Sequence, residues 1–203
     1  MMQSPFHSKW FVDIMKLNSG RCGIECGVGD GGTYAMLATL CDDITGIDIE
    51  PMSDDIHSKM VGIPCQWNYI REDCTNSKYL RGLDDDSVDK FHYDAMSNGK
   101  DIAAVINIMY NKMKDDGIWC FDNFHILHFS AMLILMRQWL DYHKGQELML
   151  YPFAIVSDND RRGKIYLTKN RVSSSRYYRK ISGIELMRVP SCRWISERNN
   201  NGN

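Results

Sequence analysis

Strand-like and helix-like segments alternate along most of this chain, and this alternation is the strongest constraint on its fold. Segments 21–26, 44–49, 64–70, 88–93 and 117–121 are predicted to be strands, and segments 6–17, 33–40, 102–114 and 126–143 have helical periodicity. Strands that are separated by helices pair in parallel, because each helix returns the chain to the same end of the sheet. The sequence therefore predicts an α/β protein with a parallel sheet.

The last two strand-like segments, 147–156 and 164–168, have no helix between them. The connecting residues 157–163 are rich in Asp, Asn and Gly, which favours a turn and an antiparallel hairpin. We therefore expect a Rossmann-like, seven-stranded, mostly parallel sheet with an antiparallel C-terminal hairpin and helices on both faces. Because 203 residues suit one α/β domain, we expect a single domain. Its expected parts are an N-terminal helix (1–20), a cofactor-binding core (21–169) and a basic C-terminal extension (170–203).

The charge and cysteine content exclude several classes of protein. The net charge of −2 gives no indication of a nucleic-acid or membrane partner, and no apolar stretch reaches the ~20 residues of a membrane span. The seven cysteines contain no CxxC pair, and the N-terminus has no secretory signal, so a reducing, cytoplasmic compartment is expected. The basic extension has interleaved aromatic residues and could bind nucleic acid, stack on sugars or pack as a helix; nucleic acid is not the expected partner.

A glycine-rich segment lies between the first core strand and the following helix. Its residues are Gly27, Val28, Gly29, Asp30, Gly31 and Gly32. This spacing also fits a dinucleotide-binding loop, and a tight turn without a ligand is a third interpretation. The carboxylates of Glu25 and Asp30 favour a cationic ligand over a pyrophosphate. Asp48 ends the next strand, where a carboxylate can accept hydrogen bonds from a ribose.

The segment GIECGVGDGG, followed by TGIDIE, resembles the first two motifs of class I S-adenosylmethionine-dependent methyltransferases, and the resemblance covers roughly residues 20–170. It implies that Glu25 contacts the methionine amino group and that Asp48 holds the ribose. Asp73, in the segment REDCT, would meet the adenine amine. The full cofactor-binding set implied in this way is Glu25, Gly27, Val28, Gly29, Asp30, Gly31, Gly32, Asp48, Ile49, Asp73 and Cys74.

Oxygen-bearing side chains follow the next two strands. Asp94 comes directly after segment 88–93, and Asp122 and Asn123 follow segment 117–121. Because the carboxyl ends of parallel strands meet at one edge of the sheet, we expect these three side chains to converge. Two carboxylates and an amide suit Mg²⁺. The alternative is that Asp122 and Asn123 cap the helix expected from residue 126.

The segment MKDDGIWCFDNF (113–124) is similar to the metal-binding stretch of metal-dependent O-methyltransferases, which include catechol-type enzymes and a group that tailors macrolide deoxysugars and cephalosporins. The resemblance implies a divalent cation at Asp94, Asp122 and Asn123. The catechol enzymes carry a lysine shortly after the aspartate that matches Asp94, whereas residues 96–99 are Met-Ser-Asn-Gly here. The sugar-methylating enzymes are therefore the nearer analogue.

These observations predict methyl transfer to a hydroxyl of a vicinal diol on a sugar or glycan. Asp94 is the first candidate for the base, followed by His125 and then His92. The expected partner is a glycan-building polypeptide with glycosyltransferase domains, of the kind found in large algal viruses, to which this domain is fused or bound. A catechol-type O-methyltransferase, an NAD-dependent oxidoreductase and a catalytically silent cofactor-binding scaffold remain alternatives.

Overall fold

The computed structural model describes residues 5–95, 99–125, 151–157 and 162–181. The helices are α1 (Pro5–Met15), α2 (Gly32–Ala38), α3 (Asp54–Met60), α4 (Lys78–Gly82), α5 (Gly99–Met109), α7 (Arg171–Ile181) and the 3₁₀ helix η1 (Cys74–Asn76). The strands are β1 (Cys22–Cys26), β2 (Asp43–Asp48), β3 (Gln66–Arg71), β4 (Val88–Tyr93), β5 (Met113–His125), β6 (Tyr151–Ser157) and β7 (Arg162–Thr168). The predicted helix at 126–143 lies outside the described residues.

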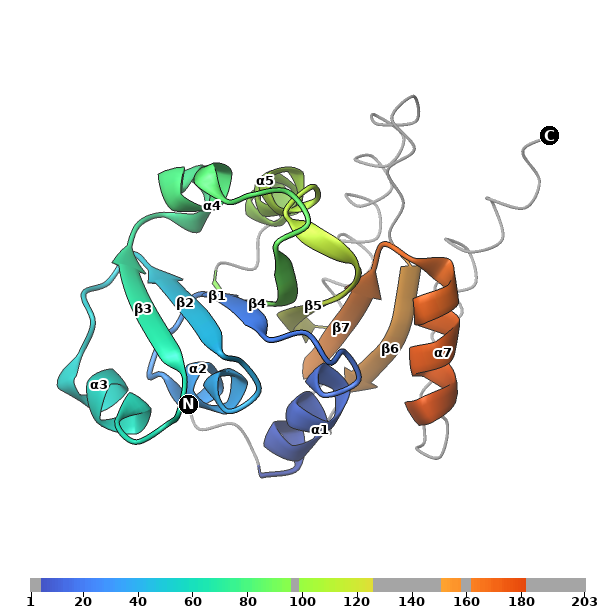
Figure 1. Cartoon of the computed structure of the whole chain (residues 1–203), viewed down its shortest axis with the longest axis horizontal. Coiled ribbons are helices and arrows are strands. Elements are labelled where there is room, and N and C mark those ends of the chain that lie inside the picture. Colours follow the sequence, from blue (N-terminus) through green and yellow to red (C-terminus); the bar gives the residue numbers. More distant parts are fainter. Residues whose placement is uncertain (1–4, 96–98, 126–150, 158–161, 182–203) are drawn as a thin grey trace.

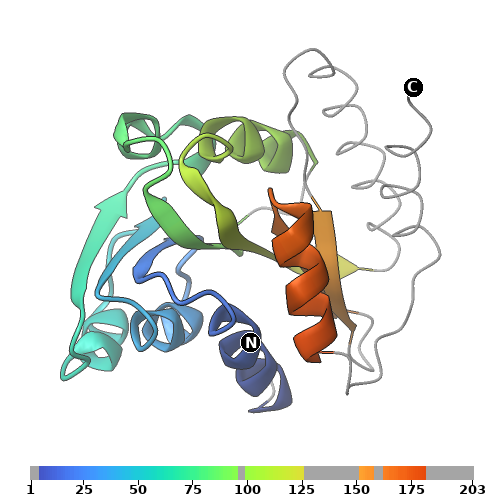
Figure 2. The same cartoon turned by 45° about the vertical axis from the view of Figure 1, so that its right-hand side comes forward.

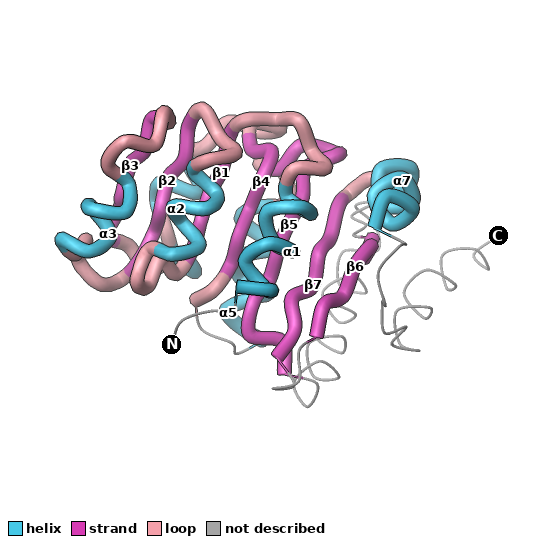
Figure 3. The backbone as a smooth tube through the Cα atoms, turned by 90° about the horizontal axis from the view of Figure 1, so that it is seen from below, coloured by secondary structure: helices cyan, strands magenta, loops and turns pink. Residues whose placement is uncertain are grey.

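The strands form one sheet in the order β3-β2-β1-β4-β5-β7-β6 (Figures 1 and 3). Neighbours from β3 to β5 pair in parallel, whereas β7 is antiparallel to both β5 and β6. The predicted mostly parallel sheet with an antiparallel C-terminal pair is confirmed. The chain order reverses between β1 and β4, and the carboxyl ends of strands at such a reversal are where α/β sheets bind ligands.

Helices cover both faces of the sheet, as predicted (Figure 2). Helices α4 and α5 pack on one face through a core that includes Leu80 and Val105. Helices α1, α2 and α3 pack on the other face, where Phe11, Leu37 and Ile56 are buried together, and Tyr177 of α7 joins that second core. The two apolar layers fix the strands, and therefore fix the positions of the polar side chains at the strand ends.

The expected boundary between the helix at 102–114 and the following strand is wrong. Helix α5 ends at Met109 and β5 already begins at Met113. The reason is strand pairing: the backbone N–H groups of Ser87 and Val88 both donate to the carbonyl of Lys112 at 2.9 Å. Hydrogen bonding at the start of β4 thus takes the place of the last predicted helical turn.

The short helices α3 and α4 were not predicted, because each has at most seven residues and shows little periodicity. Both begin at a serine whose side chain accepts a backbone N–H, Ser53 for α3 and Ser77 for α4. Among the described residues, none of the helices has the length and apolar character that a membrane crossing requires. The six described cysteines are free thiols.

Candidate active site

The glycine-rich loop follows β1 and contacts the end of β4. Gly27, Gly29 and Gly31 all have left-handed backbone conformations, with φ of 84°, 54° and 80°. At Gly27 a side chain is excluded for a second reason, since a Cβ would lie 2.5 Å from the backbone of Asp94 and Ala95. Only glycine lets the loop approach this strand end so closely.

Asp48 fixes the end of β2 beside this loop. Its carboxylate accepts hydrogen bonds from the backbone N–H groups of Gly29 and Glu50, each at 3.0 Å. The next residue, Ile49, is a large apolar side chain that is 61% exposed. The structure therefore brings the loop, Asp48 and Ile49 together at the carboxyl end of β2.

Other residues of the predicted cofactor set make contacts within the protein. The Asp30 carboxylate accepts from the backbone of Gly32 at 2.9 Å and lies 3.8 Å from the Lys59 ammonium. The Asp73 carboxylate accepts from the backbone and hydroxyl of Thr75 and caps η1. The remaining members, Val28 and Cys74, are buried. Their contacts with a cofactor stay predictions.

Glu25 and His92 form a buried pair at the ends of β1 and β4. The two residues are direct neighbours in the strand register, and Oε1 of Glu25 lies 2.9 Å from Nδ1 of His92. Burial raises the pKa of Glu25, with a contribution from Asp94, and burial lowers the pKa of His92. Both shifts favour the uncharged forms, so one proton lies between the two atoms. The outer atoms, Oε2 of Glu25 and Nε2 of His92, have no hydrogen-bond partner among the described residues.

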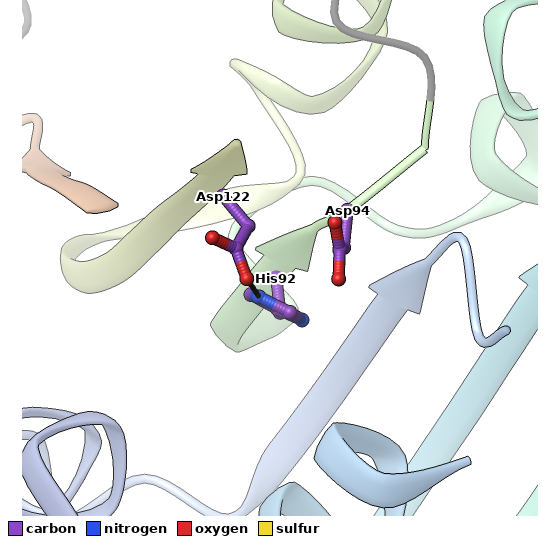
Figure 4. Close-up of side chains that lie close together, drawn as sticks. All are labelled: His92, Asp94 and Asp122. Carbon is purple, nitrogen blue, oxygen red and sulfur yellow. Dashed lines mark ion pairs between the residues drawn. The ribbon is translucent and has the colours of Figure 1, made fainter. Parts of the chain in front are cut away.

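His92, Asp94 and Asp122 gather where β4 ends beside the C-terminal part of β5 (Figure 4). Each contributes one potential ligand atom, and these atoms all lie within 4.8 Å of one another. Nε2 of His92 is 4.0 Å from Oδ2 of Asp122. The predicted convergence of Asp94 and Asp122 is confirmed. The structure also places His92, which was not among the predicted metal ligands, in the same group.

The other two predicted residues of this site, Asn123 and His125, belong to β5, and their side chains lie outside the described part of the molecule. The interpretation of Asp122 and Asn123 as a helix cap is wrong, because both lie inside a strand that continues to His125. The register of β5 against β7 shifts between Phe121 and Phe124. Asp122 thus lies at an irregularity of the sheet, where a side chain can leave the regular alternation.

Lys164 is a site residue that the sequence analysis did not identify. It comes from β7, and its ammonium contacts Oδ2 of Asp122. Burial by itself lowers the pKa of Lys164, but the neighbouring Cys120 and Asp122 outweigh it and the pKa is raised, so the group is a cation. The one signal in the sequence was a charged residue among the apolar residues of segment 164–168.

Comparison with known proteins gives no match to any family model and none to a curated protein. Solved structures do match. The O-methyltransferase TomG from Streptomyces achromogenes, in complex with S-adenosylmethionine, has a TM-score of 0.63 at 14% identity over 82% of this chain and 81% of that chain. An rRNA methylase from Streptococcus thermophilus has a TM-score of 0.56 at 14% identity, covering 84% and 99%. The N-methyltransferase NodS from Bradyrhizobium japonicum has a TM-score of 0.57 at 12% identity, over 84% of this chain and 100% of that chain. The chain has the Rossmann-like fold of methyltransferases.

This methyltransferase fold allows the divalent cation implied by the sequence resemblance to be tested against the described side chains. Oδ2 of Asp122 faces His92, and the same oxygen is already in contact with the Lys164 ammonium. The Lys164 and Asp122 side chains are 5% and 13% exposed, so water screens this pair little. A divalent cation beside the ammonium would be repelled by it. The described side chains therefore do not fit the metal.

Acidification is expected to destabilise the methyltransferase fold through His92. Because burial lowers the pKa of His92, the folded protein keeps this imidazole neutral at pH values where the unfolded chain is protonated. The stability contributed by the neutral group is fully present above the ordinary pKa of 6.5 and is lost as the pH falls toward the lowered value. A difference of one bound proton between the unfolded and folded states gives the free energy of unfolding a slope of about 1.4 kcal/mol per pH unit.

Urea unfolding of the wild type, His92→Phe and Glu25→Gln at a series of pH values below about 7 measures this effect. The free energy of unfolding of His92→Phe is expected to fall less steeply on acidification than that of the wild type. The Glu25→Gln variant keeps the imidazole and loses the opposing contribution of Glu25, so its free energy of unfolding is expected to fall more steeply on acidification than that of the wild type. The raised pKa of Glu25 acts in the opposite direction, since its stabilisation is lost as the pH rises. Equal slopes in the wild type and His92→Phe would contradict the prediction.

Proposed function

We propose that this chain is an S-adenosylmethionine-dependent methyltransferase that methylates a hydroxyl group. One observation carries the proposal: the glycine loop packs directly against the backbone of Asp94. The approach is so close that a Cβ added to Gly27 would lie 2.5 Å from the backbone atoms of Asp94. A cofactor lying over this loop would hold its methyl group close to the Asp94 carboxylate. The fold shared with TomG, an O-methyltransferase that binds S-adenosylmethionine, supports this reading.

The residues around the loop suit the parts of this cofactor. Oε2 of Glu25 is buried without a hydrogen-bond partner among the described residues, and an ammonium such as the methionine amino group would satisfy it. Asp48 is oriented by two backbone N–H groups and would accept from the ribose hydroxyls. The exposed side chain of Ile49 offers an apolar surface for the adenine ring.

The chemistry would be a direct displacement. The acceptor hydroxyl gives its proton to the Asp94 carboxylate, and the oxygen attacks the methyl carbon. The carbon–sulfur bond breaks with its electron pair going to sulfur, which leaves a methyl ether, S-adenosylhomocysteine and protonated Asp94. The protein contributes alignment of the oxygen with the methyl–sulfur axis, because displacement requires that geometry.

The proposed acceptor class is a sugar or glycan with neighbouring hydroxyls. Its support is the sequence resemblance to sugar-methylating enzymes, together with the pair of carboxylates, Asp94 and Asp122, at the strand ends. Carboxylates at this position would accept hydrogen bonds from two adjacent hydroxyls. Incubation with labelled cofactor and a panel of methyl glycosides, with catechol as the competing probe, tests this class by mass spectrometry. Methylation of catechol alone would refute the sugar assignment.

Cofactor identity is tested by thermal shift. S-adenosylhomocysteine is expected to raise the Tm of the wild type, whereas NAD is expected to leave it unchanged. Removing the charge that holds the ribose, in Asp48→Asn, is expected to weaken S-adenosylhomocysteine binding about tenfold, the loss of one charge-assisted hydrogen bond. The matched control is Asp43→Asn, which alters an exposed aspartate at the other end of β2. Stabilisation by NAD alone would overturn the proposed function.

A further inference from the structure

Lys164 belongs to β7, in the antiparallel part of the sheet, and reaches the acidic cluster formed by Asp94 and Asp122 from there. The residue is 4% exposed, and its ammonium lies 5.4 Å from the centre of the Phe11 ring on α1. The ring of Phe11 in turn contacts His92 edge to face, with ring centres 4.9 Å apart. The apolar ring lies on one side of the ammonium and the Asp122 carboxylate on another, so Lys164 is held within the site.

Stability alone does not account for a lysine at this place. Removing an ammonium from water costs several kcal/mol, and a buried ion pair is often no more stable than apolar residues of the same size. An apolar side chain at position 164 would also pack on Phe11. The register shift of β5 between Phe121 and Phe124 lies opposite this part of β7 and places Asp122 where the ammonium reaches it.

We propose that the ammonium of Lys164 takes the place that a divalent cation has in the metal-dependent O-methyltransferases which the sequence resembles. The catalytic role of Lys164 in this inference rests on the proposed function. The replacement of a cation by the ammonium does not. Lys164 neutralises Asp122 and donates a hydrogen bond to the acceptor oxygen, which makes that hydroxyl more acidic. Asp94 then receives the proton, as in the displacement described above.

A charge count supports the replacement of a divalent cation by the Lys164 ammonium. Asp94, Asp122 and Lys164 together leave one net negative charge at the strand ends. The sulfonium of S-adenosylmethionine carries one positive charge, so the cluster with its cofactor would be balanced. A divalent cation added to these groups would leave an excess of two positive charges in a site with little access to water, and charges there interact strongly.

The first experiment measures Mn²⁺ binding by the electron paramagnetic resonance signal of the free ion, with Mn²⁺ as the probe and no acceptor present. The wild-type chain is expected not to bind. The Lys164→Ala variant removes the ammonium that contacts Asp122 and leaves room beside the two carboxylates, so its affinity for Mn²⁺ is expected to rise at least about tenfold. The matched control is Lys169→Ala, which removes a lysine that pairs with Asp86 and Asp115 at the other end of β7.

Mn²⁺ binding by the wild type would overturn the inference, since the cluster would then be a metal site with its lysine in place. Absence of binding in both the wild type and Lys164→Ala would also overturn it, because the carboxylates would not form a cation site even without the lysine. If Lys164→Ala does not fold, as judged by circular dichroism, Lys164→Ser serves as the second variant that removes the ammonium.

The second experiment measures methyl transfer in the presence of a chelator. The wild-type rate is expected to be unchanged by EDTA, whereas Lys164→Met is expected to lose about 100-fold in kcat with normal S-adenosylhomocysteine binding. An EDTA-sensitive wild type would contradict the inference. If no acceptor is methylated by any variant, the proposed function fails, and the Mn²⁺ result still decides whether Lys164 replaces the cation.

Discussion

The Gly27→Ala variant is expected to lose about 2–5 kcal/mol of its free energy of unfolding, together with its affinity for S-adenosylhomocysteine. Two penalties add at this position. An alanine is strained at a φ of 84°, and its Cβ would lie 2.5 Å from backbone atoms of Asp94 and Ala95. Backbone cannot move aside as a flexible side chain can, so the loop or the end of β4 must shift.

A matched control separates these two penalties. Gly62 has a similar φ of 86°, but a Cβ there would meet nothing within 4 Å. Gly62→Ala is therefore expected to cost only the conformational strain, about 1 kcal/mol, and to keep cofactor affinity. Urea unfolding and isothermal titration with S-adenosylhomocysteine measure both quantities. Equal losses in the two variants would show that the close approach of the loop to β4 has no energetic importance.

The Asp94→Asn variant is expected to lower kcat by about 10²–10⁴, the usual contribution of a general base. Asparagine keeps the size of the side chain but cannot take the acceptor proton. Because the cofactor contacts assigned to Glu25 and Asp48 remain, S-adenosylhomocysteine affinity is expected to change little. The measurement is the initial rate of methyl transfer to an acceptor found in the glycoside panel.

The control for this variant is Asp89→Asn, near the start of β4, whereas Asp94 directly follows the other end of that strand. Asp89 accepts from the backbone of Cys22 at 3.0 Å and pairs with Lys114 at 2.8 Å. Its loss is expected to reduce stability and to leave kcat per folded molecule unchanged. A wild-type rate in Asp94→Asn would remove Asp94 from the role of base and leave His92 and His125 as the candidates.

Strands β1, β2 and β4 of the parallel part of the sheet were the most predictable elements. Segment 88–93 matches β4 at both ends, and β1 and β2 are each displaced by one residue at most at each end. Buried parallel strands are continuous apolar runs that a sequence shows clearly. Short helices such as α3 and α4 are harder to predict, because their serine caps are local signals that many loops also carry.

The predictability of the candidate site follows from how each residue reaches it. Asp94 directly follows β4 and Asp122 lies on the neighbouring strand β5, so topology alone brings them together. The pairing of Glu25 with His92 depends on the register between β1 and β4, and the arrival of Lys164 depends on the register of β7 against β5. Those registers join residues more than 40 positions apart, and hydrophobic periodicity contains no information about them.

The position of Lys164 on β7 has a consequence for the order in which the site forms during synthesis. The residues assigned to the cofactor, from Glu25 to Cys74, leave the ribosome well before β7, which is the last strand in chain order but lies between β5 and β6 in the sheet. Until β7 docks, the Lys164 ammonium is not beside Asp122, and neighbouring carboxylates such as those of Asp94 and Asp122 repel. A nascent chain can therefore complete β1 and β2 while its acidic cluster still lacks the lysine, so docking of β7 completes the cluster.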